Sequence, residues 1–130
     1  MAITGMNHAV LYVRDAALSA QFYQEVLGFS EVASLPGAVF LQAQDSVNDH
    51  DLGLFSVGDG AGPSMAGRGA VGLYHLAWEV DTLTVLGDMR GRLDAAGALA
   101  GASDHGGTKS VYGRDPDGLE FEICWIVPGS

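Results

Sequence analysis

A short pattern near the start of the chain recurs in its second half, and this repeat limits the possible folds more than any other feature. The two copies are HAVLYVRDAAL, which begins at His8, and HLAWEVDTL, which begins at His75. Each copy opens on an alternating apolar segment typical of a strand and continues into a segment with helical periodicity. The chain of 130 residues is therefore predicted to contain two similar modules.

The first module is predicted to have the order βαβββ. Residues 7–13 alternate as a strand does, and residues 14–28 place apolar side chains on one helical stripe that ends at Gly28. Three more strands are predicted after this helix, separated by LPG and by the polar segment QDSVNDHD, which are turn-forming sequences. These strands are expected at residues 30–34, 38–43 and 52–57.

The second module repeats this order after a connection rich in Gly and small residues, a composition that suits a surface loop. It is predicted to contain a strand at residues 73–80, a helix at 81–97, and strands at 98–103, 109–114 and 119–125. We therefore expect one domain over residues 1–130, with module 1 at about 1–58, the linker at about 58–71 and module 2 at about 72–130.

Each module would leave one face of a four-stranded sheet uncovered, unless helices lie outside and the two sheets curl around a shared cleft. We therefore predict an α+β fold with a cupped mixed sheet. Alternation places His8 on the same face as Val10 and Tyr12, while the opposite face of that strand is wholly apolar. The same alternation places His75 and Glu122 on the cup face of the second module.

The same alternation places two further carboxylates, Glu79 and Glu120, on the cup face. We expect them at the rim of the cup in water, because burying an unpaired carboxylate is costly.

Composition excludes several classes of partner. Sixteen acidic residues against six basic ones give a net charge of −10, which repels phosphate backbones and anionic lipid heads. No apolar run approaches the roughly 20 residues needed to cross a bilayer, so neither nucleic-acid nor membrane partners are expected.

The single cysteine, Cys124, cannot form an internal disulfide, and the first residues do not have the pattern of a signal peptide. A cytoplasmic location is therefore expected.

The paired βαβββ modules, with a His at the first strand of each and DPDGLEFE at the last turn and strand, resemble the vicinal oxygen chelate superfamily. The resemblance covers nearly the whole chain. This superfamily includes glyoxalase I, extradiol catechol dioxygenases, fosfomycin resistance transferases, methylmalonyl-CoA epimerase and metal-free bleomycin-binding proteins. The fold alone therefore leaves the reaction open.

The resemblance implies a metal site formed by His8, His75 and Glu122, which match the family's ligand positions. Two imidazoles and one carboxylate leave coordination sites open, as in Fe(II) oxygenases that bind both substrate and O2. Glyoxalase I and the epimerase take a fourth ligand from the last strand of the first module, where this chain has LGLFSV, without a carboxylate, His or Gln. We expect a divalent metal, Fe(II) first and Mn(II) as the alternative.

The segment from His105 to Glu122 has a spacing that resembles the extradiol ring-cleaving dioxygenases, with Val111, Tyr112 and the DPDG turn between them. The resemblance implies that His105 is an acid and base beside the O2 site and that Tyr112 hydrogen-bonds a substrate oxygen. An imidazole suits proton transfer near neutral pH. The residues alone also allow a solvated loop position for His105, a structural role for Tyr112 and a surface position for His50.

The resemblance therefore implies ring opening of a catechol-like substrate by O2, with a small aromatic substrate and a homodimer as the expected partners. Many extradiol enzymes carry two paired-module domains, whereas this chain has one pair. The alternatives are another metalloenzyme of this fold, namely a glyoxalase, an epimerase or a fosfomycin-type thiol transferase, and a non-catalytic drug-binding resistance protein. A transferase for an anionic substrate would need cations, and only Lys109 and Arg114 are well placed. A binding protein would not need the three ligands.

Overall fold

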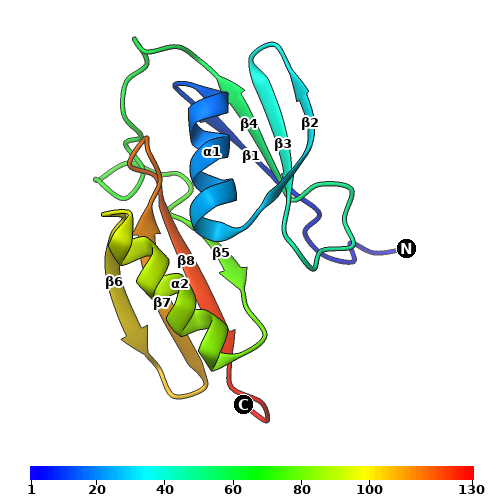
Figure 1. Ribbon diagram of the computed structural model, residues 1–130, viewed down its shortest axis with the longest axis vertical. Coiled ribbons are helices and arrows are strands. Elements are labelled where there is room, and N and C mark those ends of the chain that lie inside the picture. Colours follow the sequence, from blue (N-terminus) through cyan, green and yellow to red (C-terminus); the bar gives the residue numbers. More distant parts are fainter. The chain divides into compact units, whose positions relative to one another are not determined.

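A computed structural model describes all residues of the chain and divides them into two compact units, Met1–Gly62 and Pro63–Ser130. We refer to them as unit 1 and unit 2. The division falls inside the Gly-rich connection. Each unit contains one four-stranded sheet and one helix, in the order strand, helix and three strands (Figure 1). The predicted α+β class and the duplicated βαβββ order are therefore confirmed.

Unit 1 has a mixed sheet with the strand order β1-β4-β3-β2. The first strand runs parallel to β4, and the other neighbours are antiparallel. The elements of unit 1 are β1 (Ala9–Val13), α1 (Ala16–Leu27), β2 (Ser30–Leu35), β3 (Ala38–Gln42) and β4 (Leu52–Ser56).

Helix α1 begins where the sequence supplies a cap and ends where it supplies a glycine. The Asp15 carboxylate accepts hydrogen bonds from the backbone N–H groups of Ala17 and Leu18, and Gly28 ends the helix with a left-handed φ of 80°. The apolar stripe of the helix packs on β3 and β4. Their shared core includes Ala16, Ala20, Tyr23, Leu27, Leu41, Leu52 and Leu54.

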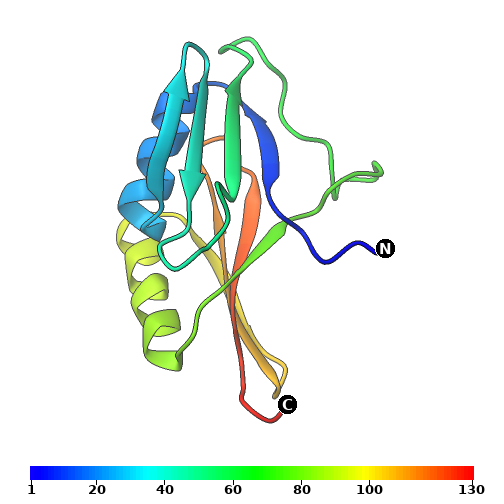
Figure 2. The ribbon, with the colours of Figure 1, turned by 90° about the vertical axis from the view of Figure 1, so that its right-hand side faces the viewer.

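Unit 2 repeats this topology with the strand order β5-β8-β7-β6, in which β5 and β8 are parallel. Its helix packs against β8, β7 and β6 and covers one face of the sheet (Figure 2). The elements of unit 2 are β5 (Leu76–Glu79), α2 (Leu83–Ala95), β6 (Leu99–Asp104), β7 (Thr108–Arg114) and β8 (Glu120–Ile126). Neither α1 nor α2 has the length and apolar character required to span a membrane.

The first strand of each unit starts later than the sequence predicts. Both strands were expected to include the histidine, but β1 begins after His8 and β5 begins after His75. In each case the ladder starts with the first residue that finds a parallel partner, Ala9 opposite Leu52 and Leu76 opposite Phe121. Each histidine therefore lies just outside the sheet, at the end where its first strand begins.

Burial follows the predicted alternation. In β8, Phe121 and Ile123 are each 2% exposed and belong to the core, whereas Glu122 between them is only half-buried on the opposite face. In β1, Val10 and Tyr12 are exposed while the following Val13 is buried. Each sheet thus has one face in its core and one face that carries the polar and exposed side chains.

Candidate metal centre

In unit 2, the imidazole of His75 lies between two carboxylates of β8. Its Nε2 atom is 3.1 Å from Oε1 of Glu122, and its Nδ1 atom is 3.4 Å from Oε2 of Glu120. The parallel pairing of β5 with β8 creates this arrangement, because Ala77 pairs with Glu122 and His75 precedes it by two positions. Glu120 and Glu122 are also two residues apart and therefore share a face.

Glu122 is held in place from the neighbouring strand. The hydroxyl of Ser110, a buried residue of β7, donates a 2.7 Å hydrogen bond to Oε2 of Glu122. This bond occupies one carboxylate oxygen and leaves Oε1 toward His75. Residues that hydrogen-bond a metal-binding side chain in this way fix its orientation.

Glu120 is not at a solvated rim, as the sequence suggested, because its side chain is only 13% exposed. It is paired: Nη2 of Arg114 lies 3.4 Å from Oε1, and the hydroxyl of Tyr74 hydrogen-bonds the same carboxylate. That hydrogen bond and the negative charge of Glu120 raise the pKa of Tyr74. Pairing removes the cost that led us to expect Glu120 in water, whereas Glu79 is exposed as expected.

The His75–Glu122 pair has the chemistry of two adjacent metal ligands. When two metal–ligand bonds of about 2.0–2.2 Å meet at right angles, their donor atoms are about 3 Å apart. His75 Nε2 and Glu122 Oε1 have close to this separation. The buried Nδ1 of His75 also has no hydrogen-bond partner. Metal-binding histidines usually donate their second N–H to a carboxylate, and Glu120 is close enough to accept after a small movement. These residues therefore fit a divalent cation.

In unit 1, His8 is exposed just before β1, and its Nδ1 is hydrogen-bonded to Oδ1 of Asn7 at 2.8 Å. Its Nε2 is therefore the free nitrogen. The ring of His50 lies against the ring of His8, with 4.4 Å between their centroids. The ring of Phe40 packs on His50, with 5.2 Å between those two centroids. The sequence left the role of His50 unassigned, and the structure places its ring beside that of His8, a predicted ligand.

A buried aspartate folds the loop that carries His50 back onto the sheet. Asp51 accepts hydrogen bonds from the backbone N–H of Ala43, the hydroxyl of Ser46 and the amide of Asn48. The same Asn48 amide donates to the backbone carbonyl of Asn7, next to His8. The loop between β3 and β4 is thereby tied to the start of β1.

The predicted ligands are divided between the two units, with His8 in unit 1 and His75 and Glu122 in unit 2. Within either unit alone, no three His, Cys, Asp or Glu side chains form a group that could hold a metal ion. The structure thus brings two of the three predicted ligands together, and the complete triad stays a prediction.

The two predicted catalytic residues lie in different surroundings in unit 2. Tyr112 pairs with Glu122 across β7 and β8, its ring centroid is 6.1 Å from that of His75, and its hydroxyl is hydrogen-bonded to Ser103 Oγ at 3.0 Å. His105 lies in the exposed turn between β6 and β7, where its side chain makes no hydrogen bond or ring contact. Tyr112 is therefore beside the His75–Glu122 pair, whereas His105 is held only by its backbone.

The duplicated βαβββ units and the polar residues where their first strands begin define the class of vicinal oxygen chelate proteins. Residues 5–123 match the glyoxalase family, described as the Glyoxalase/Bleomycin resistance protein/Dioxygenase superfamily. This match covers most of the chain, and the chain belongs to that superfamily. Its members include dioxygenases, other enzymes and resistance proteins, so membership leaves the reaction open.

Two curated relatives are similar over most of this chain. Catechol-2,3-dioxygenase of Bacillus subtilis (strain 168) is 28% identical over 127 residues, which are 98% of this chain and 43% of the relative. Biphenyl-2,3-diol 1,2-dioxygenase 3 of Rhodococcus globerulus is 33% identical over 119 residues, which are 91% of this chain and 61% of the relative. The chain thus spans less than two thirds of the length of either relative.

A solved structure supports the fold over its full length. The glyoxylase/bleomycin resistance protein/dioxygenase domain from Frankia sp. EAN1pec superposes with a TM-score of 0.77 at 25% identity, covering 99% of this chain and 96% of that one.

Proposed function

We propose that this chain is a metal-dependent, extradiol-type dioxygenase that uses O2 to open the ring of a catechol-like aromatic substrate. His8, His75 and Glu122 are the proposed ligands, and Fe(II) is the proposed metal, with Mn(II) as the alternative. The observation that carries this proposal is the 3.1 Å approach of His75 Nε2 to Glu122 Oε1, with Ser110 holding the other carboxylate oxygen.

The residues around the His75–Glu122 pair have different proposed roles. A bound Fe(II) ion would supply Lewis-acid and electron-transfer chemistry to the diol and O2. Ser110 orients Glu122, and Glu120 is the carboxylate that would accept a hydrogen bond from the Nδ1–H of His75. The Ser110 contact already orients Glu122 before any substrate binds.

Tyr112 and His105 are the proposed catalytic residues. The hydroxyl of Tyr112 can accept a hydrogen bond from Ser103 while it donates its own proton to a substrate oxygen. His105 is the proposed proton shuttle, and its exposed turn allows it to exchange protons with solvent.

The names of the two curated relatives agree with this reaction class, since both are dioxygenases of aromatic diols. Because the chain matches only part of each relative, their activity is carried over as a proposal. We also propose a homodimer, which light scattering of the purified protein would test.

A thiol transferase for an anionic substrate is less well supported. The two cations considered for that role already have acidic partners: Lys109 Nζ lies 2.7 Å from Asp104, and Arg114 lies 3.4 Å from Glu120. Neither is free to neutralise a phosphonate. A glyoxalase, an epimerase and a drug-binding protein remain outcomes of the experiment below.

The test begins with protein purified without oxygen and reconstituted with Fe(II) or Mn(II). We expect bound metal, and O2 uptake with catechol and 2,3-dihydroxybiphenyl but not with hydroquinone, whose oxygens are not adjacent. Loss of metal binding in His8→Ala would identify unit 1 as the source of a ligand. Absence of bound metal would overturn the enzyme assignment, and metal without O2 uptake would favour a transferase or isomerase.

A further inference from the structure

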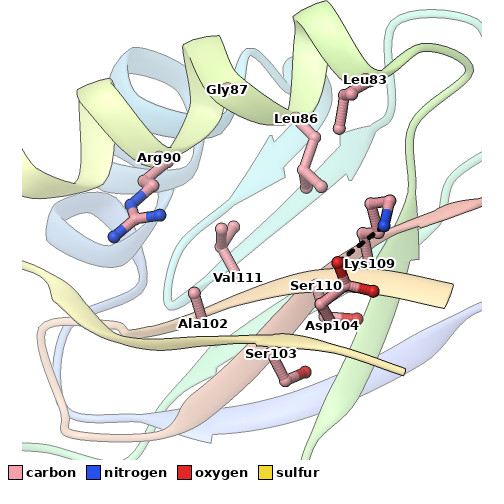
Figure 3. Close-up of a pocket in the computed structure, with 10 residues that line it drawn as sticks. All are labelled: Leu83, Leu86, Gly87, Arg90, Ala102, Ser103, Asp104, Lys109, Ser110 and Val111. Carbon is pink, nitrogen blue, oxygen red and sulfur yellow. Dashed lines mark hydrogen bonds and ion pairs between the residues drawn. The ribbon is translucent and has the colours of Figure 1, made fainter. Parts of the chain in front are cut away.

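A pocket in unit 2 lies on the other side of the sheet from the His75–Glu122 pair, between α2 and the strands β6 and β7 (Figure 3). Its volume is about 470 Å³, within the range that small-molecule sites occupy. Ala102 and Val111 point from the strands toward α2, whereas Ser103 points away from it. The pocket and the proposed metal centre therefore lie on opposite faces of one sheet, and Ser110, which hydrogen-bonds Glu122, also lines the pocket.

Gly87, in the middle of α2, is one of the residues that line the pocket. A Cβ atom added to Gly87 would have no neighbour within 4 Å, so this position has room for a side chain. Glycine inside a helix costs about 1 kcal/mol relative to alanine. Leu83 and Leu86 of α2 and Val111 of β7 supply the apolar lining, and of these three only Leu83 is well exposed.

The charges around the pocket leave one cation without a partner. Lys109 and Asp104 pair with each other at 2.7 Å, which lowers the pKa of Asp104 and neutralises that end. Arg90 extends from α2 toward the strands, and its guanidinium makes no hydrogen bond or ion pair (Figure 3). Arg90 is therefore a local site for an anion beside the exposed apolar side chain of Leu83, in a chain whose net charge of −10 otherwise repels anions.

We propose that this pocket binds a small organic carboxylate with an apolar body. The apolar part packs mainly on Leu83, the exposed apolar side chain of the pocket, and the carboxylate accepts hydrogen bonds from Arg90, whose planar guanidinium suits bidentate binding of a carboxylate. This site is independent of the metal centre and does not rest on the proposed dioxygenase activity.

The test uses 2-naphthoate as the probe on metal-free protein, with 2-naphthamide as the uncharged probe of the same shape. Calorimetry measures the affinity, and amide chemical shifts locate the site. We expect saturable binding of 2-naphthoate with shifts at Leu86, Gly87 and Val111, and about tenfold weaker binding of the amide, the loss expected for a charge-assisted hydrogen bond.

Two pairs of variants test the two features of the pocket. Arg90→Gln should weaken 2-naphthoate about tenfold, whereas Arg92→Gln removes the same charge from α2 outside the pocket and should leave the affinity unchanged. Gly87→Leu adds a side chain to a residue that lines the pocket and should weaken binding. Its control is Gly91→Leu, at another open position of α2 that does not line the pocket.

Both leucine variants improve helix propensity, so a folding defect is not expected and circular dichroism checks it. Equal affinities in Arg90→Gln and Arg92→Gln, unchanged binding in Gly87→Leu, or shifts centred on His75 and Glu122 would each overturn the proposal.

Discussion

The two oxygens of the Glu122 carboxylate have different partners, since Oε1 lies 3.1 Å from His75 Nε2 and Oε2 accepts a 2.7 Å hydrogen bond from Ser110. This division requires three adjacent strands. β5 follows His75, β8 carries Glu122 and β7 carries Ser110, and the β5-β8-β7 order makes them neighbours. The proposed ligand pair is therefore a product of the topology, and the same sheet supplies its orienting hydroxyl.

Replacing the carboxylate of Glu122 by an amide tests its role as a ligand. Glu122→Gln keeps the size and can still accept from Ser110, but it removes the charge that favours a divalent cation. We expect titration with Mn(II) to show a loss of affinity larger than the about 10–100-fold typical of residues that only orient a ligand. Glu79→Gln, on an exposed position of β5, is the matched control and should bind as the wild type does. Equal affinities in the two variants would contradict the assignment.

Ser110→Ala tests whether orienting Glu122 matters. Because Ser110 is buried and its hydroxyl bonds the carboxylate, we expect metal affinity to fall about 10–100-fold and the free energy of unfolding to fall by about 1 kcal/mol. Ser103→Ala removes a hydroxyl that bonds Tyr112 instead, so its metal affinity should not change. If both variants lose stability alike and neither loses metal, Ser110 has only a structural role.

Substitutions of the two proposed catalytic residues should separate chemistry from metal binding. His105→Gln and Tyr112→Phe are expected to keep the metal, whereas turnover of catechol should fall, by about 10²–10⁴-fold where a general acid or base is lost. Metal analysis and O2 uptake on the same samples measure both quantities. Wild-type turnover in His105→Gln would identify this residue as a solvated turn histidine.

The repeat and the strand alternation were sufficient to predict the duplicated βαβββ order, because both depend on local periodicity. Two residues beside the predicted ligands could not be found in this way. His50 lies beside His8 in a loop that Asp51 hydrogen-bonds to the sheet, and the largely covered side chain of Glu120 pairs with Tyr74 and Arg114. Both depend on contacts between distant segments, for which the sequence carries no periodic signal. The complete triad depends on the two units together and stays a prediction.

The Asp104–Lys109 pair predicts a small pH effect on stability. The hydrogen bond from Lys109, followed by that from the Gly106 N–H, lowers the pKa of Asp104 in the folded state. The pair therefore stabilises the fold above the unfolded pKa of about 3.9, and this contribution is lost as the pH falls through the lower folded value. Carboxyl NMR titration should show the pKa of Asp104 rising in Lys109→Gln, and the acid-side loss of stability should diminish. Because Asp104 is exposed, the effect is small, and an unchanged titration would contradict it.

Close packing at Gly113 predicts a clear cost for one added methyl group. A Cβ atom there would lie 2.6 Å from Cζ of Phe121 and 3.1 Å from Cδ2 of Leu93, and these two side chains are 2% and 0% exposed. Neither can move into solvent, so Gly113→Ala should lower the free energy of unfolding by about 1–3 kcal/mol. Gly101→Ala, on the neighbouring strand, has no atom within 4 Å of the new Cβ and should be neutral or slightly stabilising. Urea denaturation of both variants measures the difference. Equal stabilities would mean that the packing of Phe121 and Leu93 on Gly113 is looser than these distances indicate.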